Sequence, residues 1–183
     1  MVTLGLDIST TCVGYAFTKD KKILDMGFID IKKQTTPKEK VFKVLDFLNK
    51  SSYIDQVFTI YIEDNLSGFA GGRTSQQVIV KLAKFNAVLC FVLEDMLDME
   101  VHNINPMTAR KNVFGKARIK GLKAKDFVKQ EIEKMYNTSK WCKKTTRGNW
   151  DKRNNDMYDG LVMSLFEKKA WFISKLVVYY INV

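Results

Sequence analysis

The chain has 183 residues, of which 46% are hydrophobic and 27% charged, a balance that argues against a disordered or fibrous protein and favours one globular domain over residues 1–183. Thirty lysines and arginines against twenty acidic residues give a net charge of +10 at pH 7, which favours a polyanionic partner. Cys12, Cys90 and Cys142 are odd in number and widely spaced, which argues against a disulfide framework or a zinc site and indicates a reducing compartment.

The first part of the chain predicts strands followed by a helix. Strands are expected at Val2–Asp7, Val13–Thr18 and Ile23–Ile31, which are short and rich in β-branched or aromatic residues. Lys19–Lys22 is a polar turn that would join the second and third strands as a hairpin. Thr36–Glu39 offers an N-cap, a proline and a capping-box acid, so a helix should begin there.

The middle of the chain predicts a central strand and a long helix. Val57–Ile62 is apolar on both faces, which is typical of a strand inside a sheet. Thr74 and Gln77 form a second capping box. The helix that follows has an apolar stripe made of Val78, Leu82, Phe85, Leu89, Val92, Leu93 and Met96.

The remainder adds a strand and three helices. A fifth strand is expected at Glu100–Ile104, and helices are expected near Pro106, over Lys123–Tyr136 and from Asn154. The resulting order is three strands, helix, strand, helix, strand and then helices. This order is typical of an α/β layer fold with a mixed sheet.

Four acidic side chains lie where a metal-dependent nuclease would need them. Asp7 ends the first strand and Glu63 ends the fourth. Asp156 and Asp159 are three residues apart, so a helix would place both on one face. Such pairs are common on solvated surfaces, but the apolar residues within 161–166 indicate a helix packed on the core. Acids at the ends of apolar elements are costly unless cations lie among them, and a pair of divalent ions suits phosphodiester cleavage.

Four segments occur in a characteristic order along the chain: Gly5–Gly14, Ile62–Glu63, Asn105–Ala117 and Asp156–Met163. Together they resemble the RuvC family of Holliday-junction resolvases, which has the ribonuclease H-like fold. The chain departs from the family at Ile8 and Ser9, where the family has Pro-Gly, and at Gly160, where it has alanine. Phe69 matches the family's loop aromatic only loosely.

The resemblance implies an α/β ribonuclease H-like fold, with a mixed five-stranded sheet whose first three strands are antiparallel, flanked by helices. It implies a structure-selective DNA endonuclease in which Lys111 or Lys123 neutralises charge on the scissile phosphate. Phe69 would stack on an unpaired base, although packing of this loop residue on its own sheet fits equally well. Two Mg²⁺ or Mn²⁺ ions per site would be held by Asp7, Glu63, Asp156 and Asp159.

Basic residues are concentrated in one part of the chain. Between Arg110 and Arg153 there are fifteen basic residues and four acidic ones. This asymmetry favours a DNA-binding surface, and a solvated basic face is the alternative. Trp141, Trp150 and Trp171 fit either DNA contact or core packing. The candidate DNA-binding residues are Phe69, Arg73, Arg110, Lys111, Lys116, Arg118, Lys120 and Lys123.

The expected partners are branched DNA and a second copy of the chain. Four-way junctions are the first candidate substrate, followed by flaps, forks and three-way junctions. A symmetric homodimer would place two equivalent sites on opposed strands, with the helix from Thr74 to Met96 at the interface; packing of its stripe on the sheet is the alternative. The apolar segment 170–183 is too short and too interrupted to span a bilayer and is read as a packed tail or a dimer contact, so no membrane partner is expected. The N-terminus shows no leader, which predicts a cytoplasmic protein, in a bacterial host cell if the chain is phage-encoded.

Two other classes share parts of this pattern. Asp7–Thr11 is similar to the phosphate-binding turn of actin-like and sugar-kinase ATPases, but those proteins have two domains and a second glycine-rich loop. A non-catalytic junction-binding protein could keep the fold, but clustered negative charge near phosphate would be of no use to it. Nuclease and ATPase assays would separate the three classes.

Overall fold

The structure, a computed structural model, describes residues 1–64 and 76–168. Its sheet has five strands in the spatial order β3-β2-β1-β4-β5. The first three strands pair antiparallel, and β4 pairs parallel with both β1 and β5. The predicted mixed five-stranded sheet is therefore confirmed. The strands are β1 (Val2–Ile8), β2 (Cys12–Lys19), β3 (Lys22–Asp30), β4 (Val57–Glu63) and β5 (Val101–Ile104).

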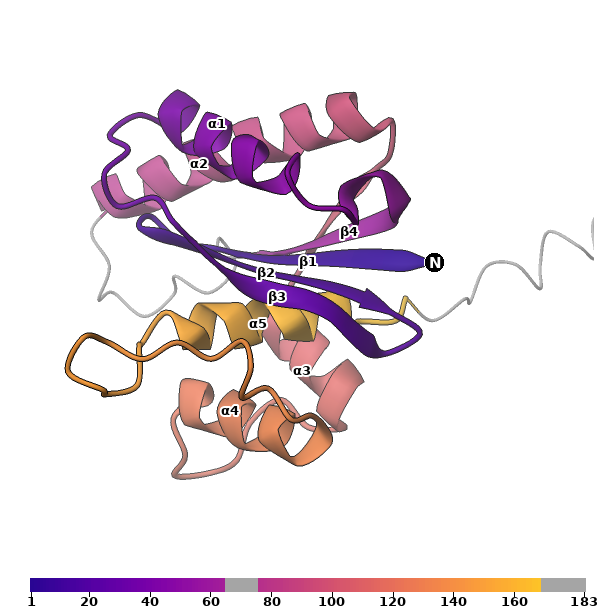
Figure 1. Ribbon diagram of the computed structural model, residues 1–183, viewed down its shortest axis with the longest axis vertical. Helices are drawn as coiled ribbons and strands as arrows, with labels where there is room; N and C mark the ends of the chain where they lie inside the picture. The colour runs from indigo at the N-terminus through magenta and orange to yellow at the C-terminus, as the bar shows by residue number, and fades with distance from the viewer. Residues whose placement is uncertain (65–75, 169–183) are drawn as a thin grey trace, which may run out of the picture.

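Helices cover both faces of the sheet (Figure 1). The face with α1 and α2 lies opposite the face with α3, α4 and α5. α1 begins at the predicted place because the Thr36 side chain accepts a hydrogen bond from the Glu39 backbone N–H, and Glu39 caps Thr36 in return. Thr74, the other predicted cap, lies outside the described residues. The helices are α1 (Pro37–Leu48), α2 (Gln76–Leu97), α3 (Pro106–Phe114), α4 (Ala124–Met135) and α5 (Asn154–Ser164).

Alternation along β1 divides its side chains between two apolar layers. Leu4, Leu6 and Ile8 are buried in the layer that includes α1 and α2. Successive residues of a strand point to opposite faces, so Gly5 and Asp7 face α5. This alternation turns the Asp7 carboxylate toward the helix that carries the other two aspartates.

Glycines let α5 lie directly against the backbone of the sheet. A Cβ atom added at Gly5 would lie 2.2 Å from the carbonyl oxygen of Gly160, and one at Gly14 would lie 1.8 Å from the carbonyl oxygen of Asp156. A Cβ atom at Gly160 would lie 2.9 Å from the Gly14 backbone. No side chain fits between these elements, so backbone contact sets the depth of α5 on the sheet.

The apolar stripe of α2 mostly faces the protein itself. Leu82, Phe85, Leu89 and Leu93 are buried in the same layer as β1, whereas Val78 is exposed. Length and composition alone would allow α2 to cross a membrane, and 28% of its 18-residue apolar window is buried among the described residues. The predicted dimer seam is therefore largely used for packing within one chain.

Two of the three tryptophans belong to the second apolar layer. Trp141 is partly buried and its Nε1 donates a hydrogen bond to Asp25, 3.2 Å away. Trp150 packs near Tyr158, with ring centroids 6.0 Å apart. Trp171 lies outside the described residues.

Candidate active site

Three predicted acids meet at one edge of the sheet. Asp7 ends β1, Glu63 ends β4 and Asp159 lies on α5. One carboxylate oxygen of each lies within 4.8 Å of the other two. The residues are 8%, 9% and 5% exposed, respectively. Parallel pairing of β1 with β4 brings the first two strand ends together, and the glycine contact of α5 brings the third acid to them.

The fourth acid and two cations complete the site. Asp156 lines the same cavity, and its Oδ1 lies 3.1 Å from Nζ of Lys125 on α4. Nη2 of Arg110 on α3 lies 3.2 Å from Oδ1 of Asp159. The cavity has a volume of about 340 Å³, and Ser9 and Thr10 also line it. Six elements thus contribute to one pocket, because Val78 and Leu82 of α2 line it too, and its four acids outnumber its two cations.

Electrostatics in this pocket are unfavourable in the absence of further positive charge. Burial, followed by the charges of Glu63 and Asp159, raises the pKa of Asp7 well above its ordinary value. Burial and the Asp159 charge raise the pKa of Glu63 to about 8, although Arg110 opposes the shift. Burial also raises the pKa of Asp159, again against the effect of Arg110. The pocket therefore favours protons or cations over free carboxylates.

One atom of the site has its hydrogen-bonding capacity unused. Oε2 of Glu63 is buried and has no hydrogen-bond partner among the residues that the structure describes. A buried carboxylate oxygen without a partner is costly, and a cation would relieve that cost. Together with the clustered oxygens of Asp7 and Asp159, it forms the hard oxygen ligand set that Mg²⁺ and Mn²⁺ prefer. The residues present therefore fit a divalent metal.

The basic residues that line the pocket differ from the two that were predicted to take part in catalysis. Lys111 and Lys123 are exposed and do not line it; Arg110 and Lys125 do. α4 begins at Ala124, so the side chain of Lys125 in its first turn reaches Asp156. The sequence signal for Lys125 was only its place two residues after Lys123, within the same basic segment.

The remaining predicted DNA-binding residues are placed as follows. Arg118 and Lys120 are exposed in the segment between α3 and α4. Nζ of Lys116 lies 3.5 Å from Oε1 of Glu131, so this lysine is partly neutralised. Phe69 and Arg73 lie outside the described residues.

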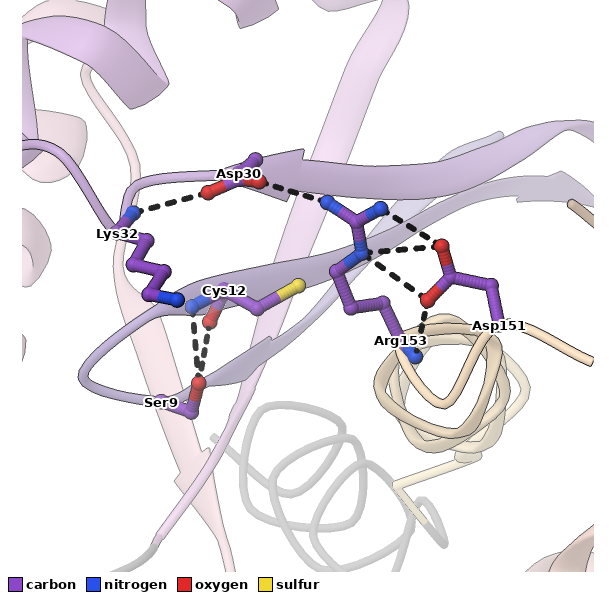
Figure 2. A network of polar contacts seen from close by, with 6 residues as sticks. All are labelled: Ser9, Cys12, Asp30, Lys32, Asp151 and Arg153. Atoms are coloured by element: carbon purple, nitrogen blue, oxygen red, sulfur yellow. Dashed lines mark hydrogen bonds and ion pairs between the residues drawn. The ribbon is translucent and has the colours of Figure 1, made fainter. Parts of the chain in front are cut away.

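Polar contacts hold the loop after Asp7 in place (Figure 2). Oγ of Ser9 donates to the carbonyl oxygen of Cys12 and accepts from its N–H, at 2.8 and 3.0 Å. Nζ of Lys40 on α1 donates to the carbonyl oxygen of Thr10. These contacts fix the turn that forms one wall of the pocket.

A second network ties the start of α5 to the edge of the sheet. Arg153 donates to both carboxylate oxygens of Asp151, and its Nη1 lies 2.6 Å from Oδ2 of Asp30 at the end of β3 (Figure 2). Asp156 follows one turn later on α5. Asp151 is thus a structural partner of Arg153 and does not line the pocket.

Comparison with known proteins agrees with this architecture. No protein-family model and no curated protein sequence matches the chain. Solved structures do match. A RuvC structure from Thermus thermophilus is 13% identical over 90% of this chain and 91% of its own, with a TM-score of 0.56. The T. thermophilus RuvC in complex with a Holliday junction substrate is 14% identical over 90% of this chain and 91% of its own, with a TM-score of 0.60.

The chain has the RuvC fold. The yeast mitochondrial Holliday junction resolvase Ydc2 is a further neighbour, 14% identical over 89% of this chain and 75% of its own, with a TM-score of 0.57. The predicted resemblance is confirmed for the fold. At this level of identity the comparison shows the architecture, and the chemistry must be argued from the pocket.

Proposed function

We propose that this chain is a metal-dependent DNA endonuclease that resolves four-way junctions or related branched DNA by paired nicks. The observation that carries the proposal is the cluster of Asp7, Glu63 and Asp159, whose carboxylate oxygens lie within 4.8 Å of one another. The substrate class is taken from the structural neighbour that was solved with a Holliday junction.

The carboxylates would hold two Mg²⁺ or Mn²⁺ ions. Bound there, such ions supply a hydroxide nucleophile and stabilise the leaving oxygen of the phosphodiester. Asp7 and Glu63 offer oxygens from rigid strand ends, and Asp159 offers one from α5. Arg110 orients the Asp159 carboxylate through the contact at 3.2 Å. Asp156 offers a fourth carboxylate at the mouth of the pocket.

Lys125 would contact the scissile phosphate. Its side chain is 58% exposed, so it can reach both Asp156 and a bound backbone. Burial lowers the pKa of Lys125, but the charges of Asp156 and Asp159 outweigh this effect and raise it overall. The ammonium therefore stays protonated at neutral pH. A fixed positive charge at this place would stabilise the negative charge that develops on the phosphate.

The direct test is cleavage of a four-way junction with Mg²⁺. Asp7→Asn, Glu63→Gln, Asp156→Asn and Asp159→Asn should each lower the cleavage rate by orders of magnitude, because each removes a metal ligand. Junction binding should persist, since each substitution removes repulsion with phosphate. Asp20→Asn is the matched control: Asp20 is exposed, and its φ of 50° suits asparagine.

Three outcomes would argue against the proposal. Full activity of the four ligand variants would show that the cluster is not the catalytic site. ATP hydrolysis without cleavage would favour the kinase-like class. Junction binding without cleavage by the wild type would favour a binding protein.

A further inference from the structure

The segment between α4 and α5 contains a short hairpin. Lys144 and Trp150 form an antiparallel bridge, and N–H of Thr145 donates to the carbonyl oxygen of Asn149 at 2.8 Å. The turn closes at Gly148, whose φ of 77° favours glycine. We call residues 143–151 the basic hairpin. In Figure 1 the segment that contains it, drawn in orange, projects beyond the N-terminal end of α5.

The basic hairpin and its flanks carry positive charge without counter-charge. Five basic side chains of the hairpin and its flanks are exposed, and none of the five forms an ion pair with an acid within residues 1–64 and 76–168. The acid within the hairpin, Asp151, is held mainly by Arg153, with a smaller contribution from the charge of Lys143. Like charges this close repel one another, so the cluster fits a surface that binds a polyanion. The residues are Lys140, Lys143, Lys144, Arg147 and Lys152.

The basic hairpin is firmly attached to the helix that carries two of the site's acids. N–H of Lys143 donates to Oδ1 of Asn154, and Nδ2 of Asn154 donates to the carbonyl oxygen of Lys143, at 3.0 and 2.7 Å. Asn154 is fully buried in the first turn of α5. Trp150 packs near Tyr158 and under Nζ of Lys129, 4.0 Å from the ring centroid. The charges are therefore presented on a fixed support.

A hollow of about 580 Å³ lies between the basic hairpin and the C-terminal end of α4. Lys134, Lys143 and Lys144 line it. Glu133 also lines it, but Oε1 of Glu133 lies 4.0 Å from Nζ of Lys129 and accepts a hydrogen bond from Tyr158. Nζ of Lys134 is already paired with Oε1 of Glu131, 2.8 Å away. The hollow thus offers the ammonium groups of Lys143 and Lys144 beside a largely compensated acid, which suits a sugar–phosphate backbone.

We infer that the basic hairpin binds the phosphate backbone of a duplex arm of the DNA substrate, outside the cleavage site. This inference rests on the proposed nuclease function. β1 runs toward the same end of the molecule at which the hairpin projects, and Asp7 ends that strand (Figure 1). A duplex with one phosphate at the carboxylates would therefore extend past the hairpin. Lysines act as point charges, which suits backbone contact rather than base reading.

The test compares two double variants of equal charge. Lys144→Gln/Arg147→Gln removes two cations from the basic hairpin. Lys19→Gln/Lys22→Gln removes two exposed cations from the turn at the opposite end of the sheet, where Lys19 pairs with Val2. Binding is measured in Ca²⁺ over a range of salt, on a junction with long arms and on one whose arms end just beyond the cleavage positions. Thermal melting of both variants checks that they fold.

On long arms, the hairpin variant should lower the slope of log affinity against log salt by about 1.8, since each lost phosphate contact removes about 0.9. On short arms it should bind as the wild type does, and the control variant should match the wild type on both. Cleavage at saturating protein in Mg²⁺ should be unchanged in the control variant.

Two results would overturn the inference. An unchanged slope on long arms would show that the hairpin does not bind DNA, and an equal loss on both junctions would place the hairpin at the cleavage site. Failure of the wild type to cleave any junction would instead overturn the proposed function, because the slopes are measured without cleavage.

Discussion

Burial and neighbouring negative charges shift the pKa of Lys125 in opposite directions. Burial favours the neutral amine, whereas the carboxylates of Asp156, Asp159 and Asp7 favour the ammonium and prevail. A lysine that keeps its charge beside acids can neutralise a phosphate without first gaining a proton. At the residue scale, removal of the Lys125 side chain should therefore affect the rate of cleavage more than the affinity for DNA.

We expect Lys125→Ala to lower the single-turnover cleavage rate by about 10²–10³-fold at saturating Mg²⁺ and DNA, the range for loss of one preorganised group that stabilises transition-state charge. Lys123→Ala, two residues earlier and outside the pocket, should weaken binding and leave that rate nearly intact. Rapid-quench measurement of both variants decides the matter. An equal loss of rate in Lys123→Ala would return the catalytic role to Lys123, one of the two lysines predicted from the sequence.

The pKa of Glu63 predicts how the metal-free protein responds to pH. The folded side chain keeps its proton up to about pH 8, whereas its ordinary pKa is 4.5. Between these values the folded state binds more protons than the unfolded state, so the free energy of unfolding falls as pH rises. Under the proposed function, Mg²⁺ would replace the proton and should restore more stability at the upper end of this window than at the lower end.

Urea unfolding with and without a chelator, at about pH 5 and about pH 8, measures this effect. Glu63→Gln should reduce the pH dependence of the metal-free protein, because the amide does not titrate, but should not abolish it, because the pKa values of Asp7 and Asp159 are raised as well. Asp20→Asn should keep the wild-type dependence. A pH slope in Glu63→Gln equal to that of the wild type would show that this carboxyl is not the source.

At the scale of elements, the contact of α5 with β1 and β2 controls the geometry of the site. Gly14→Ala would bring a Cβ atom to 1.8 Å from the carbonyl oxygen of Asp156, so the helix must move. Overpacking usually costs about 1–3 kcal/mol, and we expect about 3 kcal/mol or more here because backbone is displaced. Gly160→Ala makes the milder contact of 2.9 Å and regains about 1 kcal/mol of helix propensity.

Gly160→Ala should therefore fold with a smaller loss of stability, while its cleavage rate falls because Asp159 is shifted next to the substitution. Urea unfolding and cleavage assays on the two variants give the comparison. Wild-type stability in Gly14→Ala would contradict the tight contact.

The regular elements could be predicted from local signals. The capping box at Thr36 and the alternation through Asp7 depend on neighbours in sequence, and the structure has both where they were expected. The convergence of Asp7, Glu63 and Asp159 followed from the position of each acid at the end or on the packed face of an element.

The basic side of the site could not be predicted in the same way. Which lysine near the start of α4 faces the pocket depends on how α4 is rotated against α5, and many basic residues occur in that segment. The stripe of α2 was ambiguous because packing on a sheet and packing on another helix require the same spacing. The structure places Leu82, Phe85 and Leu89 in a layer shared with both the sheet and α1 of the same chain.

At the scale of the whole molecule, dimer formation stays a prediction, and the structure redirects it to the other face of α2. Val80, Val88 and Phe91 are 50%, 41% and 68% exposed, although they are apolar. Their spacing places them within one stripe on the outward side of the helix. A two-fold contact through this stripe would bury it and set two sites in equivalent positions.

Phe91→Asp should convert a dimer into a monomer, because it would bury a charge at the centre of such a contact. Sedimentation at micromolar concentration measures the change. Phe42→Asp is the control, since Phe42 is a 60% exposed phenylalanine on the neighbouring α1. A wild-type monomer that still makes paired symmetric nicks would remove the case for the two-fold axis.

Because the four acids are far apart in the sequence, the ribosome synthesises them at different times. Asp7 and Glu63 leave the ribosome early, the exposed lysines follow, and α5 brings Asp156 and Asp159 near the end of the described chain. A nascent chain without α5 has half of its carboxylates and lacks the helix that joins them. Under the proposed function, such a chain could attract DNA but could not cut it, so cleavage activity would arise only once α5 has folded onto the sheet.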